Sequence, residues 1–186
     1  MTKAKRTQHH IPGLEITSRD HIQGPADAPV TLMEYGDYQC PYCGEAYHVI
    51  KQLQKRVGDG MRFVFRNFPL NSIHPYAEGA AEAAEAAGGQ GKFWEMHDTL
   101  YEHQDELRPE QLLDHAKRLW LDLARFTDDL INRVYAERVR EDFMSGVRGG
   151  VNGTPTFFIN GVRYDGSYDF EPLLEAIEPY LKKRAA

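Results

Sequence analysis

Two cysteines are the residues of this chain best suited to carry chemistry. Cys40 and Cys43 are the only cysteines among 186 residues, and Pro41 and Tyr42 separate them in the motif Cys-Pro-Tyr-Cys. Two thiols at this spacing can exchange disulfides, bind a metal or fill space in a core. The choice between these uses decides what the protein does.

The elements around the motif favour ionisation of the Cys40 thiol. Strand-forming residues at 30 to 35 precede it, and apolar residues at helical spacing follow it from 46 to 57. Pro41 suits the first turn of that helix, so Cys40 lies at the helix N-cap or next to it. Free backbone N–H groups and the helix dipole stabilise a thiolate there. We predict that Cys40 is the accessible, low-pKa nucleophile and that Cys43, turned inward one turn later, resolves its mixed disulfides.

Three other uses of the cysteine pair are open at this point. Zinc prefers a complete tetrahedral set of protein ligands, and His48 is the one histidine close to the motif in sequence. Buried cysteines can also be plain packing residues, although the junction of a strand and a helix is a poor place for them. Thiolates of two chains could bridge an iron–sulfur cluster.

Composition indicates one domain and excludes several partner classes. The formal net charge is −6 and the sequence pI is about 5.7, which argues against a nucleic-acid partner. No run approaches the roughly 18 apolar residues that span a bilayer, so we expect no membrane insertion.

The first residues bear on the compartment. The beginning of the chain is basic but lacks the apolar run of about 7–15 residues found in secretory signals. The sequence as written therefore predicts a cytoplasmic protein, or a periplasmic or otherwise extracytoplasmic one if the native N-terminus is missing.

The remaining pattern alternates between strands and helices. A second strand is expected at 61 to 68, which makes a strand–helix–strand unit with a parallel pair. Helical patterns follow at 77 to 89, 93 to 101, 110 to 119 and 128 to 144. Two short strands at 156 to 159 and 162 to 164 flank the hairpin signal Asn160-Gly161, and a helix is expected at 170 to 181.

Together these features resemble the thioredoxin-fold family, and specifically its DsbA-like branch. The resemblance rests on "GPADAPVTLMEYGDYQCPYC", on the helical block after the second strand and on "GTPTFFINGVRY", in that order. It implies an α/β thioredoxin fold with an inserted helical domain. The expected organisation is an N-terminal extension at 1–24, a thioredoxin-fold domain at 25–72 and 147–184, and the inserted helices at 73–146.

The resemblance also implies roles for residues outside the motif. Pro155 matches a proline that is cis and faces the cysteines, which would leave the Thr154 backbone free to pair with an extended substrate. The Thr154 hydroxyl could donate to the Cys40 thiolate. Glu34 matches a buried acid beneath the second cysteine, where it could relay the proton of Cys43. The alternative for Glu34 is an exposed position on an edge strand.

The motif departs from the namesake of the branch. Pro41-Tyr42 replaces a Pro-His pair, and tyrosine cannot hold a thiolate by charge at neutral pH, so we expect a less oxidising couple. Cys-Pro-Tyr-Cys is also the motif of glutaredoxins, which leaves the direction of electron flow open. We expect no catalytic role for His48. His97 is expected in the core of the inserted helices, as are three aromatic residues, Phe93, Trp94 and Tyr101.

The function predicted from the sequence is that of a protein thiol–disulfide oxidoreductase. Its partners would be protein thiols or disulfides held by Pro41, Tyr42, Thr154 and Pro155, with no metal and no cofactor besides the redox-active pair. Two alternatives stand beside it. One is a glutathione-dependent, glutaredoxin-like activity, and the other is a non-catalytic binding module for extended chains. The sequence does not determine the oligomeric state.

Overall fold

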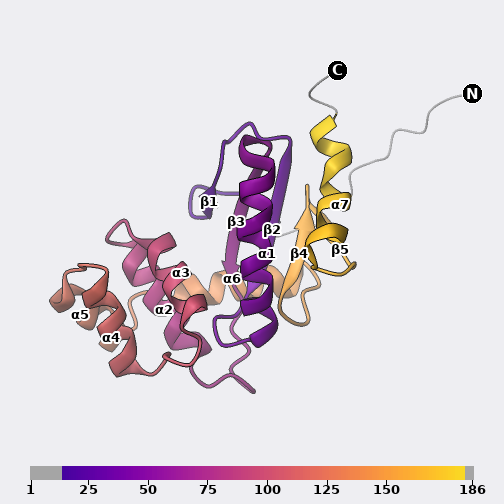
Figure 1. Cartoon of the computed structure of the whole chain (residues 1–186). Coiled ribbons are helices and arrows are strands. Elements are labelled where there is room, and N and C mark those ends of the chain that lie inside the picture. Colours follow the sequence, from indigo (N-terminus) through magenta and orange to yellow (C-terminus); the bar gives the residue numbers. More distant parts are fainter. Residues whose placement is uncertain (1–13, 183–186) are drawn as a thin grey trace, which may run out of the picture.

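A five-stranded mixed sheet forms the centre of the protein (Figure 1). The computed structural model describes residues 14–182. The strands are β1 (His21–Gln23), β2 (Val30–Gly36), β3 (Met61–Asn67), β4 (Thr156–Ile159) and β5 (Val162–Tyr164), in the order β1-β3-β2-β4-β5. The predicted parallel pair, β2 with β3, is confirmed, and the other neighbouring strands are antiparallel. The cysteine motif therefore follows directly from the middle strand.

Helices lie on both faces of this sheet and at one side of it. They are α1 (Pro41–Val57), α2 (Ala77–Gly88), α3 (Phe93–Glu102), α4 (Pro109–Arg118), α5 (Leu123–Ile131), α6 (Ala136–Arg148) and α7 (Phe170–Lys182), and a short 3-10 turn, η1 (Gly58–Gly60), follows α1. Figure 1 shows α1 and α7 in front of the sheet, α6 behind it, and α2 to α5 together at one side. None of these described helices is both long and apolar enough to cross a membrane.

The alternation of side chains along the strands divides the core in two. Val30, Leu32 and Phe63 lie in the hydrophobic cluster that contains α1 and α7. Met33 and Val64 lie in a second cluster on the opposite face, where Phe143 of α6 packs. Successive residues of a strand point to opposite faces, so Glu34 shares the α1 face with Val30 and Leu32, as the sequence predicts.

Two parts of the chain differ from the sequence-based expectation. Residues 21 to 23, expected within an N-terminal extension, form the edge strand β1 and pair with β3. The helix expected at 128 to 144 is two helices, α5 and α6. The Val134 N–H donates to the Asp129 carbonyl at 2.9 Å, and the Arg133 backbone is in the left-handed region with φ 50°. This is the backbone arrangement that ends a helix, so α5 ends before α6 begins. Residues 1–13 and 183–186 of the expected segments lie outside the described residues.

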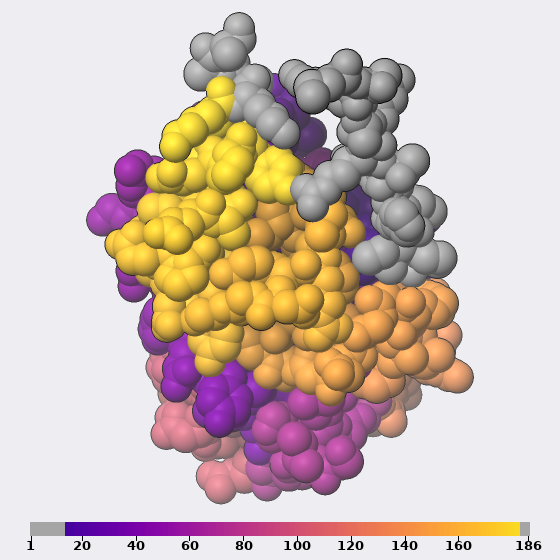
Figure 2. Space-filling view, turned by 90° about the vertical axis from the view of Figure 1, so that its right-hand side faces the viewer, coloured from indigo at the N-terminus to yellow at the C-terminus, as the bar shows by residue number. Residues whose placement is uncertain are grey.

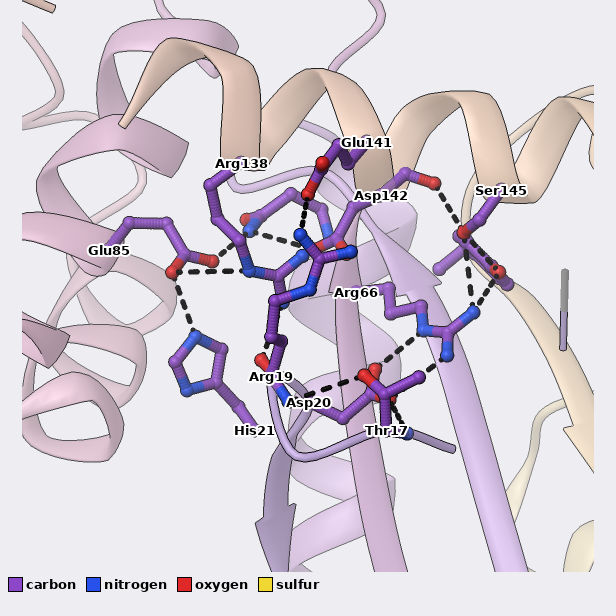
Figure 3. Close-up of polar contacts among 12 residues, drawn as sticks. Thr17, Arg19, Asp20, His21, Arg66, Glu85, Arg138, Glu141, Asp142 and Ser145 are labelled. Carbon is purple, nitrogen blue, oxygen red and sulfur yellow. Dashed lines mark hydrogen bonds and ion pairs between the residues drawn. The ribbon is translucent and has the colours of Figure 1, made fainter. Parts of the chain in front are cut away.

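A buried polar network joins the inserted helices to the sheet (Figure 3). The Arg66 side chain on β3 donates to Asp20 at 2.7 Å, and both side chains are buried. The next residue, Asn67, donates its side-chain amide to Glu85 of α2 at 2.8 Å and its backbone N–H to Asp142 of α6 at 3.1 Å. The insert is thus held by the sheet through hydrogen bonds as well as by apolar packing.

Candidate active site

The turn between β2 and α1 positions the first cysteine. Cys40 is the N-cap of α1, with φ −72° and ψ 120°, and Pro41 occupies the first helical turn. The Cys40 carbonyl accepts the N–H groups of Cys43 at 3.1 Å and Gly44 at 3.2 Å. This confirms the predicted place of Cys40 at the start of the helix, where unpaired N–H groups favour an anion.

The loop before β4 reaches the same place from the far end of the chain. The Thr154–Pro155 peptide bond is cis, as predicted. The Cys40 thiol donates to the backbone carbonyl of Thr154 at 3.4 Å. The Thr154 hydroxyl is buried without a hydrogen-bond partner among the described residues. Thr154 therefore offers both an acceptor and a free hydroxyl next to the first cysteine.

These surroundings lower the pKa of Cys40 to about 6. The largest cause is a hydrogen bond from the Cys43 thiol to the Cys40 thiolate. Burial works in the opposite direction. It is outweighed by the Cys43 hydrogen bond together with smaller contributions from the N–H groups of Cys43 and Tyr42 and from the Thr154 hydroxyl, which has no partner while Cys40 is a thiol but can donate to the thiolate. At neutral pH Cys40 is consequently a thiolate and a ready nucleophile.

Cys43 has the opposite character. Its side chain is 0% exposed, and burial raises the pKa of its thiol well above the ordinary value, reinforced by the nearby Cys40 and Glu34. The backbone N–H of Asp37, at 3.5 Å from its sulfur, opposes this only in part. Cys43 thus stays protonated until a base removes its proton.

One expectation about Cys40 needs correction. The residue is 4% exposed, so it is less accessible than predicted, although it is more exposed than Cys43. The Thr154 carbonyl lies against its sulfur and covers it. The contrast between the two thiols is therefore mainly one of pKa.

Glu34 lies on the central strand and is 2% exposed, which excludes the alternative of an exposed edge position. Burial, followed by the neighbouring Cys40 thiolate, raises the pKa of Glu34 to about 8. Its Oε1 atom has no hydrogen-bond partner among the described residues. A buried carboxyl in this state can accept or release a proton near neutral pH.

The rim of the site is formed by exposed residues. Pro41 is exposed and Tyr42 is 59% exposed, so both can touch a partner. Across from them, the Tyr168 hydroxyl donates to Glu45 of α1 at 3.1 Å. Figure 2 shows the orange and yellow C-terminal part of the chain as one continuous surface, with the purple of α1 emerging beside it.

The structure adds residues that the sequence did not single out. The buried Asp37 carboxylate accepts the Gln39 N–H at 2.8 Å, which forms the turn that leads to Cys40, and it also accepts the Leu70 N–H at 2.8 Å. An aspartate two residues before its hydrogen-bond donor is an Asx-turn signal that could have been read from "GDYQ". Gln104, from the loop after α3, touches the same turn, and nothing in its sequence context indicates this.

The structure places the two histidines that the sequence singled out in different surroundings. His48 is exposed on α1, beside the Tyr47 ring. His97 is buried in the core, where its Nδ1 lies 3.1 Å from the Tyr38 hydroxyl. In residues 14–182 no group of three or more His, Cys, Asp or Glu side chains is arranged to hold a metal ion.

Comparison with solved structures confirms the fold. The family model described as Thioredoxin matches residues 17–179. BdbD from Bacillus subtilis superposes with a TM-score of 0.81 at 27% identity, covering 93% of this chain and 98% of that one. A thioredoxin-like oxidoreductase from Silicibacter pomeroyi gives 0.78 at 25% identity, covering 91% and 95%. The thiol-disulfide exchange protein alpha-DsbA2 from Wolbachia pipientis gives 0.75 at 24%, covering 86% of each chain.

Curated relatives match at higher sequence identity but are much longer. The protein named Na(+)/H(+) antiporter NhaA 1 from Salinispora arenicola is 54% identical over 159 residues, which is 86% of this chain and 24% of that protein. The chain spans about a quarter of the length of the curated relatives it matches.

Proposed function

This chain belongs to the thioredoxin family and shares the DsbA-like fold of the solved structures that it resembles. We propose that it is a thiol–disulfide oxidoreductase acting on protein substrates. One observation carries the proposal. The pKa of Cys40 is lowered to about 6 at the start of α1, whereas that of Cys43, one turn later, is raised by burial. Such a pair separates the attacking thiol from the resolving thiol.

The exchange takes place in two balanced steps. The Cys40 thiolate attacks one sulfur of a substrate disulfide, so that a bond between Cys40 and the substrate forms, the substrate disulfide breaks and one substrate thiolate leaves. The Cys43 thiolate then attacks the Cys40 sulfur, which forms the Cys40–Cys43 disulfide and releases the second substrate thiolate. The substrate is reduced and the protein is oxidised. Run backwards, the same steps oxidise a substrate dithiol.

Glu34 supplies the base that the second step requires. The Cys43 thiol is protonated at neutral pH and buried, so solvent cannot readily take its proton. The Glu34 carboxyl lies close enough to influence the pKa of Cys43, and its own pKa of about 8 suits proton exchange near neutrality. Glu34 accepts the proton as Cys43 attacks and returns it when the reaction reverses.

The surface around Cys40 holds the substrate. Pro41 and Tyr42 are exposed directly after Cys40 in the chain, and the Thr154 carbonyl, next to Pro155, contacts the Cys40 sulfur. An extended substrate segment can lie along Thr154 and pair with its backbone, as an added strand would. Such pairing would bring the substrate disulfide next to the Cys40 sulfur, which is 4% exposed in the free protein.

Turnover and trapping experiments test this function. The protein should catalyse reduction of a peptide disulfide by dithiothreitol, and Cys40→Ser should abolish catalysis. Cys43→Ser should keep the first step and accumulate a mixed disulfide with the peptide, visible by mass spectrometry. An unchanged rate in Cys40→Ser would contradict the proposal and favour a binding module, which would keep its affinity for the peptide.

The same variants separate protein disulfides from glutathione as the substrate. A glutaredoxin-like enzyme would turn over a glutathione mixed disulfide with Cys43→Ser, because its mechanism needs one cysteine. We expect that variant to stall instead, since its resolving thiol is missing. Sustained glutathione-dependent turnover by Cys43→Ser would decide for the glutathione-dependent alternative.

A further inference from the structure

We propose that Gln104, carried by the inserted helices, is a positioning residue that holds the start of α1 and places Cys40 for exchange. The proposal rests on the proposed function and adds a residue from outside the thioredoxin-like sheet to the redox centre. Gln104 is half-buried in the loop that follows α3.

The contacts of Gln104 converge on the turn that presents the nucleophile. Its side-chain amide nitrogen donates to the Tyr38 carbonyl at 2.8 Å and to the Cys40 carbonyl at 2.9 Å. These two carbonyls lie on either side of Gln39. One carboxamide therefore fixes the backbone directly before the helix and at its N-cap residue.

Gly44 provides the space for this contact. A Cβ atom built on Gly44 would overlap the carboxamide of Gln104. Glycine inside a helix costs about 1 kcal/mol relative to alanine, so Gly44 is an unfavourable choice for α1 taken alone. Its presence is explained by the close approach of Gln104 to the helix.

The amide also acts on the charge at Cys40. The Cys40 carbonyl oxygen carries a partial negative charge and belongs to the same residue as the thiolate. The Gln104 amide places the positive end of a dipole on that oxygen, in addition to the N–H groups of Cys43 and Gly44 that it already accepts. Less negative potential next to the sulfur favours its ionised form.

The insert is fixed firmly enough to hold Gln104 in place. The Tyr47 hydroxyl of α1 donates to Glu102 of α3 at 2.9 Å, and Lys51 of α1 donates to Asp98 of α3 at 2.7 Å. Both bonds join the helix that bears Cys43 to the helix that precedes Gln104. The inserted helices thus contribute to the redox centre through a defined side chain.

Two substitutions remove the contact by different routes. Gln104→Met keeps the length of the side chain and loses both donors, whereas Gly44→Ala displaces the carboxamide and improves the helix propensity of α1. In each variant we expect the Cys40 pKa, measured from thiolate absorbance in the ultraviolet, to rise by roughly 0.2–0.7 unit, the size of other helix-terminus effects. The double variant should show no further increase, because either change alone abolishes the contact.

Gln90→Met is the matched control. The Gln90 carboxamide joins two backbone groups of Asp122 within the insert, at 2.8 and 3.2 Å, and its loss tests general loosening of the inserted helices. We expect no change in the Cys40 pKa. A pKa unchanged in both Gln104→Met and Gly44→Ala, or raised equally in Gln90→Met, would overturn the proposal. The titration does not depend on turnover, so a raised pKa in a protein without exchange activity would contradict the proposed function alone.

Discussion

The Cys40 thiol lies 3.4 Å from the backbone carbonyl of Thr154, 114 positions later in the chain. The same threonine holds a buried hydroxyl without a partner among residues 14–182, and that side chain lowers the pKa of Cys40. Thr154 therefore offers an acceptor to the thiol and a donor to the thiolate. The loop can satisfy both protonation states of the nucleophile without moving the backbone.

Thr154→Val should raise the Cys40 pKa, because it removes the hydroxyl and keeps the branched shape. We expect an increase of up to about one unit, equivalent to about 1.4 kcal/mol of lost thiolate stabilisation. Titration of the thiolate absorbance measures it. Thr156→Val is the control, since its hydroxyl donates to the Gly153 carbonyl in the same loop. Equal pKa values in wild type and Thr154→Val would show that the hydroxyl does not reach the sulfur.

The two thiols should differ sharply in reactivity. With a pKa of about 6, Cys40 is partly ionised in mild acid, while the raised pKa of Cys43 keeps that thiol protonated. Brief alkylation of the reduced protein at about pH 6, followed by peptide mapping, should modify Cys40 almost alone, and the rate should fall about tenfold per unit at lower pH. Preferential modification of Cys43 would reverse the assignment of nucleophile and resolver.

Glu34→Gln should stabilise the reduced protein at alkaline pH. The folded-state pKa of Glu34 is raised to about 8, so the folded protein loses stability relative to the unfolded chain as pH rises from about 4.5 to 8 and the buried carboxyl ionises. The neutral amide avoids this loss. Urea denaturation should show a gain of a few kcal/mol at about pH 9 and almost none near pH 4.5.

Glu34→Gln should also slow one step of catalysis. Decay of a trapped mixed disulfide through attack by Cys43 should be slower than in wild type, while formation of that disulfide by Cys40 should be nearly unchanged. If neither rate changes, the carboxyl has no part in proton transfer.

Asp20→Asn should destabilise the fold without affecting the cysteines. The substitution leaves the buried Arg66 guanidinium without its carboxylate, and loss of one partner of a buried ion pair costs about 3–5 kcal/mol. Asp165→Asn, which breaks the more exposed pair with Arg163, should cost roughly 0–1 kcal/mol. Chemical denaturation compares the two. An unchanged free energy of unfolding in Asp20→Asn would contradict the stabilising role of this ion pair.

Local signals explain why much of the site could be predicted. Pro41 marks the first turn of α1, and Asn160-Gly161 marks the hairpin between β4 and β5, each through its own backbone preference. The alternation from Val30 onward places Glu34 on a buried face. These features depend on residues within a few positions of one another, so a single sequence contains them.

The remaining features depend on partners distant in sequence. The strand β1 has three residues with no clear alternation and becomes a strand by pairing with β3. The Thr154 carbonyl that lies against the Cys40 sulfur is far from it in sequence. So is Gln104, which belongs to the inserted helices and donates to the Cys40 carbonyl. The helix α5 ends near Arg133, which adopts a left-handed backbone conformation. Residues 128 to 144 contain no glycine or proline that would have indicated this end in the sequence.

Within residues 14–182, the sheet ends on both sides in a three-residue strand, β1 at one edge and β5 at the other. Long open edges are templates on which unfolded chains add and aggregate, and short edge strands offer few backbone groups for such growth. A thiol–disulfide oxidoreductase acting on protein substrates, as proposed above, would meet this hazard whenever a substrate is incompletely folded. Under the proposed function, the short edges would leave the loop beside Cys40 as the favoured place for a substrate strand to attach, so that attachment would coincide with disulfide exchange.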